Sequence, residues 1–122
     1  MYEEDDPGLV GVRRVCLALP EAVEVEAWGR PSFRAGATGR MFAMFQGNDE
    51  HPFGIVVKAE PGEREALAHH PRCWVPWYWG SRGWIGLDLV DPPPDWDEVA
   101  ELVVASYRQV ALKRQLRALG EA

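Results

Sequence analysis

The stretch that decides the fold is WGRPSFRAGATGRMFAMFQ, residues 28–46. A run that ends in SFRAG comes first, a glycine-rich stretch from Gly36 to Gly39 follows, and a second run extends from Arg40 to Gln46. Glycine adopts the backbone conformations that tight turns require. Two such runs joined by a short segment containing glycine are typical of a β-hairpin. We therefore predict two antiparallel strands that meet at residues 36–39.

Alternation of apolar and polar residues extends the predicted sheet on both sides of this hairpin. AVEVEAW (residues 22–28) alternates with the period of a half-buried strand. In FGIVVKA (residues 53–59) and WIGLDL (residues 84–89), every second residue is large and apolar. We expect those side chains to face the core, and Trp84, Gly86 and Asp88 to lie on the opposite face.

Three further segments carry helix signals. Residues 7–19 follow Asp6, and residues 61–70 begin with proline and early acids. Residues 96–119 follow a capping pair formed by Asp95 and Glu98, with apolar side chains at helical spacing. The order of elements indicates the α+β class, an antiparallel β-sheet with helices packed on one face. We expect a single domain at residues 7–119, preceded by an acidic N-terminal tail at residues 1–6.

Composition limits the partners that the chain can have. Its 122 residues carry a net charge of −6, and without the four acids of residues 3–6 the charge would be −2. Phosphate neutralisation dominates nucleic-acid affinity, so DNA or RNA would need a local basic patch. No apolar run approaches the roughly 18 residues of a membrane span, and the start lacks the features of a secretory signal. We expect a cytoplasmic protein with no membrane partner.

Catalytic and metal-binding patterns are missing from the sequence. His51, His69 and His70 do not have the spacing of zinc ligands. Cys16 and Cys73 are too few for a disulfide framework, and we interpret both as structural. The sequence therefore predicts a protein that is not an enzyme and that has no cofactor and no metal site.

Basic side chains lie close to aromatic ones around the predicted hairpins. Cations at hairpin tips beside rings are typical of strand-based readers of nucleic acid, which hold phosphates and stack on bases. The candidate nucleic-acid-binding residues are Arg34, Arg40, Lys58, Arg82 and the stacking ring Trp84. In the alternative interpretation, Arg34 and Lys58 are ordinary solvent-side residues paired with Glu24 and Glu26.

A second hypothesis concerns the tryptophans, four of which fall between Cys73 and Leu89. They could wall an apolar pocket for a small aromatic ligand, as in a sequestering or resistance protein. The pocket residues would be Trp28, Trp74, Trp77, Tyr78, Trp79 and Trp84. Exposed rings would also suit a protein-interaction surface, and the expected assembly is a monomer or a weak homodimer.

The ordered signatures along the chain resemble the MmcQ/YjbR family of small bacterial proteins. The matching pieces are ALPE (18–21), WGRPSFR (28–34), GRMFAMF (39–45), VVKAEP (56–61), VPWYWGSRGWIGLDL (75–89) and DWDEVAELVVASYRQVA (95–111). This resemblance implies a CyaY-like fold and DNA binding through a double-wing motif of two β-hairpins. Frataxins, which share the CyaY-like fold, bind iron through acidic residues of a helix. Residues 7–19 contain no acid, and we expect no iron site.

Overall fold

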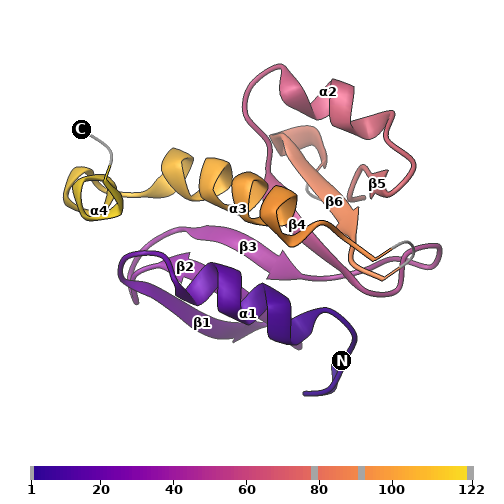
Figure 1. Cartoon of the computed structure of the whole chain (residues 1–122), viewed down its shortest axis with the longest axis horizontal. Helices are drawn as coiled ribbons and strands as arrows, with labels where there is room; N and C mark the ends of the chain where they lie inside the picture. Colours follow the sequence, from indigo (N-terminus) through magenta and orange to yellow (C-terminus); the bar gives the residue numbers. More distant parts are fainter. Residues whose placement is uncertain (1, 78–79, 91–92, 121–122) are drawn as a thin grey trace.

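The computed structural model describes residues 2–77, 80–90 and 93–120 (Figure 1). The helices are α1 (Leu9–Leu17), α2 (Glu63–Ala68), α3 (Trp96–Val110) and α4 (Lys113–Leu119), with a 3-10 turn at Gly80–Arg82. The strands are β1 (Ala22–Ala27), β2 (Arg30–Ala35), β3 (Met41–Phe45), β4 (Gly54–Lys58), β5 (Cys73–Trp74) and β6 (Trp84–Asp88).

The six strands form one sheet in the order β1-β2-β3-β4-β6-β5, and every neighbouring pair is antiparallel. α1 packs on β1 and β3, α3 packs on β3 and β4, and α2 packs on β5 and β6. These three helices cover one face of the sheet, so the molecule has two layers (Figure 1). The predicted α+β architecture is confirmed.

The core lies between the sheet and the helices. Ile55, Val57, Ile85 and Leu87 face it from β4 and β6, as the alternation predicts. A bulge opposite Phe33/Arg34 lets two consecutive residues of β3, Phe42 and Ala43, both join the core. The ring of Phe42 meets that of Tyr107 edge to face at 5.2 Å, which ties α3 to the centre of the sheet.

Two of the predicted helix boundaries are wrong. α1 begins at Leu9 after Gly8, which adopts the left-handed conformation (φ 90°), and Asp6 provides no side-chain cap for the helix. The long helix expected over residues 96–119 is divided, because Ala111 and Leu112 are extended. Buried Gln115 explains the break: its amide nitrogen donates to the carbonyl of Ala35, and its Oε1 accepts from the backbone of Leu112.

The acidic N-terminal segment lies against the domain. Tyr2 packs beside the core. The Arg13 guanidinium contacts Glu4 at 2.8 Å and Glu24 at 2.9 Å, and both carboxylates raise the pKa of Arg13. Since Glu24 is held by α1, it is not the partner of a strand cation. In the described part of the chain, no helix combines the length and apolar character needed to cross a membrane.

Candidate functional site

The antiparallel topology brings the sequence-predicted cations to one end of the sheet. One end of each of four strands lies there: Ala35 of β2, Met41 of β3, Lys58 of β4 and Trp84 of β6. Neighbouring strands run in opposite directions, so each strand that ends here lies next to one that begins here. The candidate cations at this end are Arg34, Arg40, Lys58 and Arg82.

The turn between β2 and β3 requires its two glycines. Gly36 has φ 98°, in the region that favours glycine, and accepts a hydrogen bond from the backbone of Gly39 at 2.9 Å. A Cβ at Gly39 would collide with the carbonyl of Ala35. The tight turn places Arg34 just before it and exposed Arg40 just after it. Two cations thus flank one tight turn.

Lys58 and Arg82 lie together beside α3. The backbone nitrogen of Lys58 donates to the Ser106 hydroxyl at 3.0 Å, and its carbonyl accepts from the Gln109 amide at 3.0 Å. A cavity of about 240 Å³ at this place is lined by Lys58, Arg64, Arg82 and Gln109, with Glu60 and Glu65. Two of the predicted residues therefore share one hollow with Arg64, a cation that the sequence analysis did not select.

The C-terminal helices bring further cations to the same end. The Ser106 hydroxyl donates to the Phe42 carbonyl at 2.6 Å, and Gln115 donates to Ala35 at 3.1 Å. These bonds place the end of α3 and the whole of α4 beside the β2–β3 turn. The cations contributed by these helices are Arg108, Lys113, Arg114 and Arg117. The helix signals in the sequence predicted that these residues are helical. They did not predict which strand ends the helix would lie beside.

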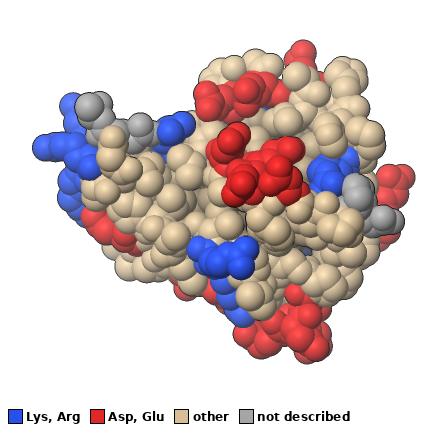
Figure 2. Space-filling model, viewed as in Figure 1, with Lys and Arg blue, Asp and Glu red and all other residues tan. Residues whose placement is uncertain are grey.

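We call this region the basic end and define it by Arg34, Arg40, Lys58, Arg64, Arg82, Arg108, Lys113, Arg114 and Arg117. It holds nine of the 13 lysines and arginines of a chain whose net charge is −6. Figure 2 shows basic atoms gathered at the α4 end and acidic atoms over α2 and the start of α3. Acids also lie near the basic end. One of them is Glu21, whose carboxylate lies 2.8 Å from the Arg114 guanidinium, and Arg114 lowers the pKa of Glu21. The charge is therefore segregated along the molecule.

Arg34 lies on the sheet face opposite the helices. Its register neighbours are Val23 of β1 and Met41 of β3. Its Nε is buried and has no hydrogen-bond partner among the described residues. The pairing of Arg34 with Glu24, considered in the alternative interpretation, is wrong, because Glu24 stands opposite core-facing Phe33 and binds Arg13 on the helix side. No ion pair links Arg34, Arg40 or Lys58 to any residue that the structure describes.

The structure corrects the role expected of Trp84. This residue does lie on the sheet face opposite Ile85, next to Lys58 in register, as predicted. However, its side chain is only 7% exposed, so it offers no free ring face to a nucleobase. Stacking on a base needs an accessible ring. Trp84 therefore serves packing at the basic end, and the cations remain as the candidate contacts.

The other proposed pocket aromatics are dispersed. Trp77 is 99% exposed, and Trp28 is 71% exposed in the β1–β2 turn, at the opposite end of β2 from the β2–β3 turn. Tyr78 and Trp79 lie outside the described residues. None of Trp28, Trp74, Trp77 and Trp84 lines any of four cavities formed by described residues. Exposed single rings at separate places do not make a walled pocket.

Trp74 instead joins a cluster that the sequence analysis missed. Its indole lies over the backbone of Gly54 and Gly86 and stacks on the His51 ring, with centroids 5.1 Å apart. Asp88, which is 4% exposed, accepts from His51 Nδ1 at 2.6 Å and from the Val90 backbone at 2.7 Å. The cluster fixes the β3–β4 loop onto β6. Glycines inside two adjacent strands were the available signal, because they often mark the close approach of another group.

Substituting Gly86 tests this cluster. A Cβ at position 86 would overlap the Trp74 indole. We expect Gly86→Ala to displace the ring and lower the free energy of unfolding by about 1–3 kcal/mol, measured by urea denaturation. The same substitution in a Trp74→Ala background should cost much less, since the two residues are coupled. Equal costs in both backgrounds would contradict the packing described.

The two thiols are expected to react slowly. Cys16 is fully buried, and burial raises its pKa; burial also raises the pKa of half-buried Cys73 to about 11. Only the thiolate is nucleophilic, so at pH 8 both should resist iodoacetamide in native protein and react fully after denaturation. The rate at Cys73 should rise with pH toward about 11. Mass spectrometry measures the alkylation of each thiol. Alkylation of Cys73 in native protein at the rate of free cysteine would contradict this prediction.

The described residues contain no group of three or more His, Cys, Asp or Glu side chains that could hold a metal ion. The His51–Asp88 pair has a second acid, Glu50, only at the edge of contact, with 4.0 Å between its carboxylate and His51 Nε2.

Comparison with known proteins gives the relationship of this chain. The YjbR family model matches residues 17–109, which include the sheet, α2 and nearly all of α3. The chain is similar to a solved structure of the Deinococcus radiodurans protein DR2400, which has a DUF419 domain. The TM-score is 0.70 at 23% identity, with 91% of this chain and 86% of that chain covered. No curated protein matches. The resemblance seen in the sequence is confirmed, and the chain belongs to the YjbR family.

Proposed function

We propose that this protein is a non-enzymatic, cytoplasmic binding module that contacts DNA through its basic end. The observation that carries the proposal is the gathering of nine of 13 lysines and arginines at one end of an acidic molecule. Phosphate contacts supply most of the affinity of proteins for DNA. A local basic patch of this kind would allow phosphate contacts although the net charge of the whole chain is −6.

The geometry favours contacts with the phosphate backbone of DNA over contacts with the bases. Arg34 and Arg40 flank one short hairpin, and Lys58 and Arg82 meet at the ends of the adjacent strands. Arginine binds phosphate with two donors in a fixed plane, so arginines on either side of a tight turn suit bidentate contact with phosphates. With Trp84 buried, base stacking at this end has no ring among the predicted residues. We therefore propose binding of duplex DNA with little sequence preference.

Fluorescence anisotropy with labelled duplex and single-stranded DNA tests this proposal. Binding at micromolar protein and low salt is expected, with log K falling linearly as log salt rises. A slope corresponding to about four phosphate contacts would match the four predicted cations. No binding at low salt, or an affinity that does not change with salt, would overturn the proposal.

The small-ligand hypothesis has a weaker basis in the structure. Its one supporting observation is the exposure of Trp28 and Trp77. Quenching of tryptophan emission by aromatic compounds would test it, and variants Trp28→Phe and Trp77→Phe would identify the ring involved. Unchanged emission across a panel of such compounds would exclude this function for the two exposed rings.

A further inference from the structure

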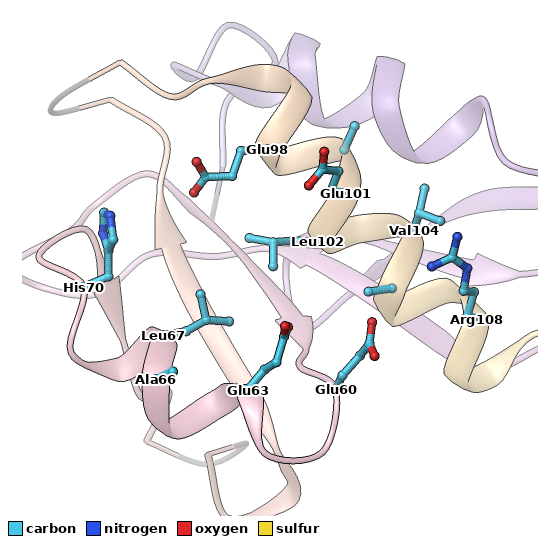
Figure 3. Close-up of a pocket in the computed structure, with 12 residues that line it drawn as sticks. Glu60, Glu63, Ala66, Leu67, His70, Glu98, Glu101, Leu102, Val104 and Arg108 are labelled. Carbon is cyan, nitrogen blue, oxygen red and sulfur yellow. The ribbon is translucent and has the colours of Figure 1, made fainter.

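The largest of the four cavities considered above is a groove between α2 and α3 (Figure 3). Its volume is about 710 Å³. Apolar side chains form its floor: Ala66, Leu67, Ala100, Leu102, Val104 and Ala105. We call it the α2–α3 groove. Of the residues that line it, Arg108 alone is also counted in the basic end.

The groove exists because α2 does not pack closely on α3. α2 has six residues, none of them fully buried, and it rests on β5 and β6. Some of the residues that line the gap are small, among them Ala66 on α2 and Ala105 on α3. Leu67 and Leu102 reach into the space between the helices (Figure 3). Apolar surface is thus left in contact with water although a compact packing would bury it.

The rim of the groove is acidic. Glu60 and Glu63 border it on the α2 side, and Glu98 and Glu101 border it on α3. These four carboxylates form no ion pair and no side-chain hydrogen bond with any residue that the structure describes. Arg108 is the one cation among the lining residues. Unpaired like charges along an apolar trough favour a partner that brings positive charge.

The length of the groove favours a helix as the occupant. On α3 its lining runs from Glu98 to Arg108, which is about 15 Å of helix, or three turns. An amphipathic helix laid in such a groove would place apolar side chains on the floor and lysines or arginines beside the rim. We propose that the α2–α3 groove docks a basic amphipathic helix of a partner protein.

This inference goes beyond DNA binding and separates the two activities in space. Phosphates would be repelled by the carboxylates of the groove, and a basic helix would be repelled by the cations of the basic end. The protein would then link DNA at the basic end to a basic protein segment in the neighbouring α2–α3 groove. Variants of each surface should therefore affect one partner and spare the other.

The probe is a synthetic peptide of about 15 residues, long enough to cover the groove as a helix, with leucine and alanine on one face and lysines on both flanks. Its counterpart carries glutamate in place of lysine. Anisotropy of the labelled lysine peptide should show salt-dependent binding to the full chain, while the glutamate peptide should not bind. Amide resonances of residues 63–70 and 98–108 should shift in NMR spectra of the labelled protein.

Matched variants make the test specific. Glu63→Gln with Glu101→Gln should raise the peptide Kd about tenfold, since two rim ion pairs are lost. Glu3→Gln with Asp5→Asn changes the net charge equally and should leave the Kd unchanged. Ala66→Arg, at an exposed position of α2 that lines the groove, should weaken binding about tenfold or more by filling it. All of these variants should bind DNA at least as well as the parent chain.

Three results would overturn the proposal. One is the absence of peptide binding at low salt. Another is equal loss of binding in the N-terminal variant, which would show a general attraction between an acidic protein and a basic peptide. The third is self-association of the chain, detected by sedimentation and abolished by Ala66→Arg. The groove would then bind a second copy of the chain and not a partner protein.

Discussion

Replacing Arg34, Arg40 and Lys58 with glutamine is expected to weaken the binding of duplex DNA about 100-fold at low salt. Each cation that neutralises a phosphate is worth about 1 kcal/mol, and three of them give about 3 kcal/mol. The slope of log K against log salt should also fall by about three contacts. These side chains have no ion-pair partner among the described residues, so their loss leaves no carboxylate stranded there.

A control variant separates local contact from overall charge. Val10→Glu with Arg14→Glu changes the net charge by the same amount on α1, where Val10 is 70% exposed and Arg14 lies 5.9 Å above the Trp96 ring at the start of α3. This variant should keep most of the DNA affinity, because its site is distant from the β2–β3 turn. Circular dichroism and a thermal melt would show that both variants are folded. Equal losses of affinity in the two would contradict a contact at the basic end.

Tyr107→Ala is expected to have the largest effect on stability, a loss of about 3–5 kcal/mol in the free energy of unfolding. Tyr107 is fully buried in the last turn of α3, where its ring meets Phe42 and its hydroxyl donates to the Pro20 carbonyl at 2.6 Å. The residue therefore connects α3 to both the sheet and the α1–β1 connection. For a domain whose total stability is about 5–15 kcal/mol, such a loss should lower the urea midpoint sharply.

Tyr107→Phe is the matched variant, since it keeps the ring and removes only the hydroxyl. It should cost about 1 kcal/mol, the usual net value of one hydrogen bond. Tryptophan fluorescence in urea measures both variants. If alanine and phenylalanine had the same effect, the contribution of the buried ring would be much smaller than the structure indicates.

Local patterns were sufficient to predict the sheet. The alternation in residues 53–59 and 84–89 assigned core-facing and opposite side chains correctly, because a period of two fixes the face once the strand exists. The glycine turn at residues 36–39 likewise fixed the β2–β3 hairpin. What failed were two helix boundaries, the start of α1 and the end of the last helix. Gln115 breaks it through a bond to Ala35, 80 residues away in the chain, and no local propensity records such a contact.

The same holds for the candidate site: local patterns predicted the cations at the strand ends, but not those that helix docking brings to them. The sequence identified Arg34, Arg40, Lys58 and Arg82 from their positions at strand ends, and the topology places them at one end of the sheet. The contributions of Arg64, Arg108 and α4 depend on how helices dock, which the sequence did not reveal. Burial of Trp84 was also hidden, since the strand pattern gives the face of a residue but not what covers that face.

Mapping the DNA contact by NMR tests the account most directly. Titrating isotopically labelled protein with a short duplex should shift the amides of the β2–β3 turn, Lys58, Arg82 and residues 108–117. The amides that line the α2–α3 groove between Glu98 and Leu102 should stay in place. Shifts concentrated at the groove or at Trp28 and Trp77, or no shifts at low salt, would contradict a DNA-binding basic end.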